Sequence, residues 1–289
     1  MKVSLRSNLE EGRLFSGFFC VLTLSLLAAA FAGTPAFAAP PSLVPITSCN
    51  TVINQPGSYF LANDLSCFGQ DGINIIVDHV TVSLNGHSIT ADVEDFGFFG
   101  NGISVGIGVL KGNAHVTIMG PGTITGFNAG INFEQVTQST VANVMATGNF
   151  FGFVINGGFA AGCAQSCPST KNTFQGNIST NNDQHGFTMN GANQNTYLGN
   201  TASNNFNGHG ILIFIGTGND VNNNVANNNG DGGITLVGGT ATGNNVIRNT
   251  ANGNGSFDLF DTSADCTSNT WRTTPSVLLH CRAFNKLAS

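Results

Sequence analysis

The sequence has few charged side chains. Only 8% of its residues are Asp, Glu, Lys or Arg, against about 25% in a typical soluble domain. The 289 residues include 9 Lys and Arg and 15 Asp and Glu, for a formal net charge of −6 at pH 7. Nine scattered cations do not form a basic patch. We therefore do not expect nucleic acid or anionic membranes as partners.

Helical periodicity is also lacking. Leu, Glu, Lys and Ala do not recur at a spacing near 3.6, and Gly and Asn interrupt the chain every few residues, which excludes a helical domain. There are one Trp and two Tyr, but 23 Phe and a hydrophobic fraction of 41%. This apolar content can form a core, so the low charge does not indicate disorder.

One long apolar run, Leu14–Phe31, lies near the N-terminus, preceded by basic residues and followed by the small-x-small sequence Ala36-Phe37-Ala38. This layout predicts a secretory signal peptide over residues 1–38. An uncleaved anchor is the alternative, because the run is nearly long enough to span a bilayer. Gly33 and Pro35 favour cleavage, so we expect a secreted protein, extracellular or periplasmic, with no membrane segment after cleavage.

Six cysteines follow the predicted cleavage site. An even number of cysteines in an exported chain suggests disulfides, although sequence alone does not settle the pairing. The cysteines form three local couples, for which we expect the bonds Cys49–Cys67, Cys163–Cys167 and Cys266–Cys281. A thiolate metal site at Cys163 and Cys167 is the alternative, but it has no third soft ligand nearby in the sequence.

A short motif recurs along the chain, in which Gly precedes alternating apolar residues. Examples are GINF at Gly130, GFTM at Gly186 and GITL at Gly233, and the spacings from Gly102 onward are 28, 22, 34, 24 and 23. Alternation of period two indicates strands. Repeats of this length indicate a solenoid, since a propeller blade needs about 40 residues. We therefore predict an all-β parallel β-helix with three short strands per coil and roughly eight coils.

A second motif frames one apolar residue with asparagines, as in NTYLGNTASNN from Asn195. Stacked coils place equivalent residues above one another, and side-chain amides can donate to and accept from their equivalents in the next coil. We expect an internal apolar column of Val141, Phe174, Tyr197, Val221, Val246 and Trp271. We also expect two amide ladders, one of Asn177, Asn200, Asn224 and Asn249, and one of Asn149, Asn182, Asn205, Asn229 and Asn254.

The ends of a solenoid need protection because an open coil exposes strand edges. We expect an N-terminal cap over residues 39–71, repeats over 72–256 and a C-terminal coil and cap over 257–289. Within the cap, Asp258, Asp261 and Asp265 are expected in a solvated loop. Residues 157–171 form an expected loop insertion, and such insertions often lie on the binding face of a solenoid.

Three early segments resemble a known family: GSYFLANDLSC (Gly57–Cys67), VTVSLNGHSITA (Val80–Ala91) and HVTIMGPGTITGFNAGI (His115–Ile131). They are similar to the opening coils of secreted right-handed parallel β-helix repeat proteins, in the pectin-lyase-like group that includes NosD-type periplasmic proteins. The resemblance implies a right-handed helix. It implies no single activity, because this fold hosts lyases, hydrolases, epimerases, adhesins and non-catalytic proteins.

The segment NGHGILIFIG, Asn207–Gly216, resembles the Gly-His-Gly segment of polygalacturonases. Only His209 matches, because Asp183 stands alone where that family has an Asp pair and no Arg-x-Lys follows. Inverting glycoside hydrolysis needs two carboxyl groups about 6.5–9.5 Å apart. Asp183 and Asp231 would lie about 9–10 Å apart if they faced the same way from coils two apart. Lyase chemistry would instead need a basic residue, commonly with calcium, and otherwise we expect no cofactor.

His185 and His209 occupy equivalent places in adjacent coils, so their side chains should be near neighbours. Two imidazoles could shuttle protons, or they could bind a transition metal, which is the alternative that the NosD resemblance suggests. They could also be exposed polar residues of a turn with no binding role. Leu212 and Phe214 should point outward if Ile211, Ile213 and Ile215 point inward. Exposed apolar side chains can stack on sugars or dock a partner, unless the 157–171 insertion covers them.

Three hypotheses follow. The leading one is a monomeric, non-catalytic scaffold that binds extracellular polysaccharide or a surface protein through His185, Leu212 and Phe214. The alternative is a polysaccharide-degrading enzyme, a hydrolase or lyase, that uses Asp183, His209 and Asp231. The weakest is a NosD-like copper site at His185 and His209. Convergent carboxylates in a groove would favour the enzyme.

Overall fold

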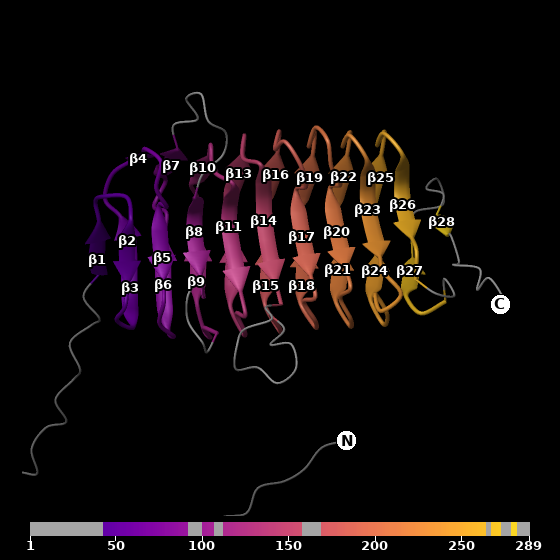
Figure 1. The fold of residues 1–289 in the computed structure, drawn as a ribbon, viewed down its shortest axis with the longest axis horizontal. Coiled ribbons are helices and arrows are strands. Elements are labelled where there is room, and N and C mark those ends of the chain that lie inside the picture. Colours follow the sequence, from indigo (N-terminus) through magenta and orange to yellow (C-terminus); the bar gives the residue numbers. More distant parts are fainter. Residues whose placement is uncertain are drawn as a thin grey trace, which may run out of the picture. The chain divides into compact units, whose positions relative to one another are not determined.

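The computed structural model describes residues 43–91, 100–106, 112–157, 169–263, 267–272 and 279–281. Its regular structure consists of strands in three parallel sheets, which are visible as stacked rows of arrows (Figure 1). In these ranges there is no helix long and apolar enough to cross a membrane.

Each sheet is built from one short strand per coil. Sheet A contains β1 (Leu43–Ile46), β3 (Gly57–Leu61), β6 (Val80–Ser83), β9 (Thr117–Met119), β12 (Thr140–Ala142), β15 (Thr173–Gln175), β18 (Thr196–Leu198), β21 (Asp220–Asn222), β24 (Asn245–Ile247) and β27 (Thr270–Arg272). Sheet B contains β2 (Thr51–Ile53), β5 (Ile73–Ile75), β8 (Asn101–Val105), β11 (Ala129–Glu134), β14 (Phe151–Asn156), β17 (Phe187–Asn190), β20 (Ile211–Phe214), β23 (Gly232–Val237), β26 (Phe257–Asp261) and β28 (Leu279–Cys281). Sheet C contains β4 (Leu65–Cys67), β7 (Ser88–Ala91), β10 (Thr123–Thr125), β13 (Met145–Thr147), β16 (Ile178–Thr180), β19 (Thr201–Ser203), β22 (Val225–Asn227) and β25 (Thr250–Asn252).

The chain passes through sheets A, C and B in turn. Strands β3, β4 and β5 make the first complete coil, and the eighth consists of β24, β25 and β26. The predicted fold class, a right-handed parallel β-helix with three strands per coil, is confirmed. The predicted boundaries between caps and repeats stay predictions.

The interior contains the predicted apolar column. Phe174 pairs in register with Val141 on one side and Tyr197 on the other, and the register continues to Trp271. The Phe174 and Tyr197 rings stack with centroids 5.1 Å apart. All members are buried except Trp271, which is partly buried.

Both predicted asparagine ladders are confirmed. In the first, Nδ2 of Asn177 donates to Oδ1 of Asn200 at 3.2 Å, and the backbone N–H of Asn177 donates to the same oxygen at 2.9 Å. The second follows the same pattern from Asn149 to Asn254. The sequence analysis missed a third ladder, which consists of Asn172, Asn195, Asn219, Asn244 and Asn269. Each ladder satisfies buried backbone and amide groups that would otherwise be costly to bury.

Two ladders end on aspartates. Asp258 accepts Nδ2 of Asn254 at 2.8 Å, and buried Asp261 accepts Nδ2 of Asn269 at 3.1 Å and the indole N–H of Trp271 at 2.8 Å. The expectation that these carboxylates lie in a solvated loop was therefore wrong. They act as acceptors for the last donors of the ladders. Asp265 lies outside the described residues.

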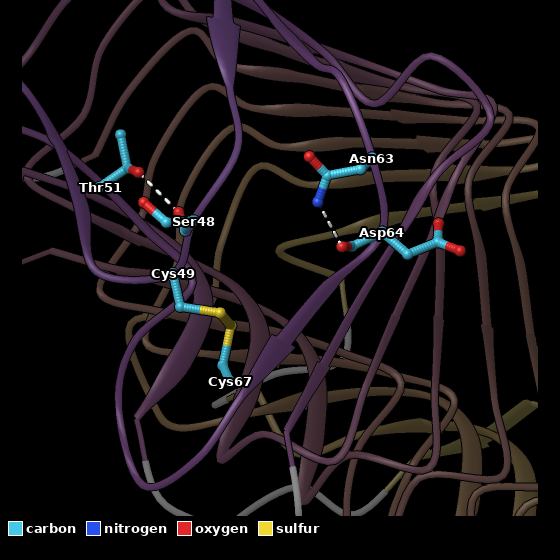
Figure 2. Close-up of a disulfide and its surroundings, with 6 residues drawn as sticks. All are labelled: Ser48, Cys49, Thr51, Asn63, Asp64 and Cys67. Carbon is cyan, nitrogen blue, oxygen red and sulfur yellow. Dashed lines mark hydrogen bonds between the residues drawn. A yellow bond between two sulfur atoms is a disulfide. The ribbon is translucent and has the colours of Figure 1, made fainter.

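One predicted disulfide is present near the start of the helix, between Cys49 and Cys67 (Figure 2). Cys67 ends β4 and is buried, so the bond ties the turn after β1 to sheet C. Cys281 is also disulfide-bonded, but its expected partner Cys266 lies outside the described residues, as does the expected pair Cys163–Cys167.

Candidate functional site

The outer face of sheet B carries a cavity of about 260 Å³. Its lining comes from four successive coils and is rich in asparagine: Asn101, Asn128, Ala129, Asn132, Phe151, Val154, Asn156, Thr188 and Asn190. Asn156 donates to Asn132 at 3.5 Å, and Asn190 pairs in register with Asn156. Amide groups in such a row can both donate to and accept from hydroxyl-rich ligands.

Next to this cavity, the corner that leads into sheet B lengthens from coil to coil. The ladder asparagine precedes the sheet glycine by three residues in Asn149–Gly152, four in Asn182–Gly186 and five in Asn205–Gly210. The glycines themselves stay in register. The backbone N–H of Gly152 donates to the carbonyl of His185, just before Gly186, and that of Gly186 donates to the carbonyl of His209, just before Gly210. The extra residues bulge outward, and His185 and His209 are among them.

The two histidines stack and replace backbone acceptors in this bulge. Their ring centroids lie 5.1 Å apart at an interplanar angle of 12°. Nδ1 of His185 accepts the backbone N–H of His209 at 2.9 Å, and Nδ1 of His209 accepts the backbone N–H of Gly232 at 2.9 Å. A neutral imidazole that accepts at Nδ1 carries its proton on Nε2. Both rings therefore present Nε2–H as a donor.

Burial keeps both rings neutral. Desolvation, with a further contribution from the neighbouring His209, lowers the pKa of His185 to about 4. Desolvation also lowers the pKa of His209, against an opposing effect of Asp231. On the cavity side, the ring centroids of Phe151 and His185 lie 5.7 Å apart. Phe151 lines the cavity, so a row of aromatic rings leads from the cavity to the imidazole pair.

Asp231 is the carboxylate next to this pair. Its Oδ2 lies 3.5 Å from Nε2 of His209, and the Asp231 side chain is 45% exposed against 16% for His209. Asp183 is bound differently, since its two oxygens accept Asn207 Nδ2 at 3.0 Å and Gln184 Nε2 at 3.3 Å. The site thus contains one imidazole–carboxylate pair, in which a solvent-accessible carboxylate lies beside a donor N–H.

The two aspartates do not occupy equivalent positions in their coils. Asp183 is the first residue after its ladder asparagine, Asn182, whereas Asp231 is the second residue after Asn229. The two-carboxylate spacing, which assumed that both side chains face the same way, stays a prediction.

Leu212 and Phe214 lie on the outer side of β20, as predicted. Leu212 is partly buried and pairs with Thr188 and Thr235, and Phe214 is 39% exposed. Ile215 is 42% exposed, so the expectation that it points inward was wrong. Its φ of 58° turns the chain out of the strand and ends the alternation.

Within the described ranges, no group of three or more His, Cys, Asp or Glu side chains is arranged to hold a metal ion. The Nδ1 lone pairs of His185 and His209 are already used by backbone N–H groups. The copper-site hypothesis for this pair stays a prediction, with no third ligand among the described residues. The other candidate metal site, the thiolates of Cys163 and Cys167, lies outside the described residues.

The architecture is that of the pectin-lyase-like right-handed β-helices. No family model matches the sequence, and no curated protein matches it. Among solved structures, the chain is similar to the A-module of the mannuronan C-5 epimerase AlgE6 from Azotobacter vinelandii, with a TM-score of 0.59 and 16% identity over 84% of this chain. This match spans 65% of the epimerase module. The chain is also similar to an alginate lyase from Paenibacillus, with a TM-score of 0.51 and 14% identity over 83% of this chain and 99% of the lyase.

These similarities correct the leading functional hypothesis. The sequence favoured a non-catalytic scaffold, but two solved structures to which the chain is similar are polysaccharide-modifying enzymes. The scaffold was preferred because no carboxylate set of a known enzyme could be matched in the sequence. We therefore set that hypothesis aside in favour of its enzyme alternative.

Proposed function

We propose that the protein is a polysaccharide-modifying enzyme that moves a proton on a uronic acid, as lyases and epimerases do. The observation that carries the proposal is the pairing of Asp231 with the neutral His209 ring, which is connected to the sheet B cavity through the stacked His185 ring and Phe151. A single carboxylate beside a donor imidazole suits proton abstraction better than hydrolysis, which needs two placed carboxyl groups.

In this proposal Asp231 is the base. Its exposed carboxylate accepts the proton from the carbon next to the sugar carboxyl group, while Nε2–H of His209 donates a hydrogen bond to the charge that develops. A neutral imidazole is suited to this role because it donates without needing to be protonated first. Cleavage of the bond between the glycosidic oxygen and the adjacent sugar carbon, with a proton passed to that leaving oxygen from protonated Asp231 or from water, gives an unsaturated product. Return of a proton from water to the opposite face instead gives the epimer, and Asp231 releases its proton to solvent. His185 holds His209 in place through the bond to its backbone N–H.

The substrate path in this proposal runs along sheet B. The asparagines of the cavity contact sugar hydroxyls, Phe151 supplies an apolar surface, and Leu212 and Phe214 extend it beyond His209. Export by the signal peptide over residues 1–38, to the periplasm or cell exterior, would bring the protein to such a polymer. Any calcium requirement is tested by adding calcium together with the substrate.

The test uses solvent deuterium. The purified protein is incubated in D2O with alginate and other polyuronates, with and without calcium, and deuterium at the sugar carbon is measured by NMR, together with the ultraviolet absorbance of unsaturated products. Deuterium in intact polymer indicates epimerisation, and absorbance indicates lyase cleavage. We expect Asp231→Asn to lower the rate by about 10²- to 10⁴-fold.

Two variants serve as controls. Asp220→Asn changes a partly buried aspartate on sheet A, which contacts Asn245, and should leave the rate unchanged. His209→Gln retains an acceptor for Gly232 and an N–H donor, so it should keep more activity than Asp231→Asn. Full activity in Asp231→Asn, or the absence of both deuterium incorporation and unsaturated product with every polyuronate, would overturn the proposal.

A further inference from the structure

A second pair of stacked histidines lies on a different corner of the helix. His79 follows β5 and precedes β6, and His115 precedes β9, so both occupy the turn between sheets B and A in successive coils. His79 N donates to Ala114 O and His115 N donates to Thr137 O, which places the two residues in register. Their ring centroids are 4.8 Å apart and the rings are parallel to within 8°.

The backbone fixes the direction of both side chains. The φ angles of His79 and His115 are 60° and 58°, so both residues adopt the same left-handed turn conformation. Asp78 accepts the backbone N–H of Ala114 through Oδ1 at 2.8 Å, which ties one turn to the next. The two imidazoles therefore leave the corner side by side from anchored backbone.

The pair differs from His185 and His209 in what its nitrogens do. His79 and His115 are both exposed, and among the described residues none makes a hydrogen bond or ion pair to either ring. No described group therefore uses the ring nitrogens of His79 and His115, whereas the Nδ1 atoms of the other pair accept backbone N–H groups. Of the two pairs, the corner pair is thus the one whose ring lone pairs no described residue occupies.

We propose that His79 and His115 form a two-imidazole binding site for a divalent transition-metal ion, with water as the remaining ligands. Neutral imidazole is a ligand for copper, nickel and zinc, and copper(II) has the highest affinity in this series. A metal–nitrogen bond of about 2.0 Å lets one ion join two nitrogens up to about 4 Å apart. The ring centroids are 4.8 Å apart and the rings are parallel, so both exposed side chains must turn until one nitrogen of each points at the same ion.

The test titrates the full, untagged chain with CuCl2 and with ZnCl2 by calorimetry at neutral pH, and records the electron paramagnetic resonance spectrum of the copper form. His79→Asn and His115→Asn are suitable variants because Asn tolerates the left-handed backbone. Each should weaken copper binding at least tenfold and to the same extent, because either leaves one imidazole. The spectrum should change from two nitrogen ligands to one.

His280→Asn is the matched control, since His280 is also exposed but is paired with Phe257 instead of a second histidine. It should bind copper as tightly as the unmodified chain. Circular dichroism on each variant establishes that the fold is retained. Unchanged copper affinity in both single variants, a one-nitrogen spectrum in the unmodified chain, or loss of binding in His280→Asn would each overturn the site.

Discussion

Nδ1 of His185 accepts the backbone N–H of His209 at 2.9 Å. The histidine side chain thus replaces a backbone carbonyl where the corner of the coil bulges and the parallel ladder is interrupted. This ties the neutral state of His185 to the stability of the fold, because a protonated ring would present N–H to N–H.

We expect the protein to lose stability as the pH falls from about 6.5 toward 4. The pKa of His185 is about 4 in the folded state and ordinarily 6.5. The unfolded state therefore binds the proton first, so stability decreases as the pH falls through this window. The loss from this residue should reach about 2 kcal/mol at pH 5. Urea unfolding at pH 7 and pH 5 measures it.

His185→Gln supplies the comparison, because Gln offers an acceptor to His209 N and does not titrate. Its unfolding free energy should change less between pH 7 and pH 5 than that of the unmodified chain. Identical pH dependence in the two proteins would show that folding does not lower the pKa of His185.

Asn200→Ala should destabilise the fold by about 3–5 kcal/mol. Asn200 Oδ1 accepts both the backbone N–H and Nδ2 of Asn177, and its own Nδ2 donates to Phe174 O and Asn224 Oδ1. Removing the amide leaves several buried groups without partners, each at a cost of about 1–3 kcal/mol. Thermal and urea unfolding would measure the loss. Asn252→Ala, at an exposed position on β25, should change stability by no more than about 0.5 kcal/mol.

Asp261→Asn should destabilise the C-terminal coils. Asp261 accepts Ser263 N, Asn269 Nδ2 and Trp271 Nε1, and all three are donors. An amide replaces one acceptor oxygen with a donor, so at least one donor is left facing another, at a cost of about 2–3 kcal/mol. Trp271 is the only tryptophan, so its fluorescence reports this region directly. An unchanged fluorescence transition in the variant would contradict the assigned role.

Tyr197→Phe should raise stability by about 1 kcal/mol. The Tyr197 hydroxyl is buried and has no hydrogen-bond partner among the described residues, and burial raises its pKa well above the usual value. Removing an unsatisfied polar group from a core removes its desolvation cost. Tyr59→Phe is the contrasting variant, since the Tyr59 hydroxyl donates to Gln55 O at 2.8 Å, and its loss should be neutral or slightly destabilising. A Tyr197→Phe protein that unfolds more easily would indicate a partner for the hydroxyl.

The repeating architecture could be predicted from the spacing of residues alone. Apolar alternation after each glycine predicted the strands of sheet B, and the asparagine spacing predicted two ladders, because equivalent residues of a solenoid must stack. The third ladder was present in the same spacing, at Asn172, Asn195 and Asn219, and could have been found by the same rule.

The tertiary structure alone decided the site. His209 contacts Asp231, from the next coil, and not Asp183, because corner lengths differ by single residues and a one-residue difference changes which side chains meet. It also decided that Asp261 is buried, since only the folded last coils bring Asn269 and Trp271 to it. Stacking of equivalent positions is a local rule that repeats, whereas contacts at irregular corners depend on the exact path of the backbone.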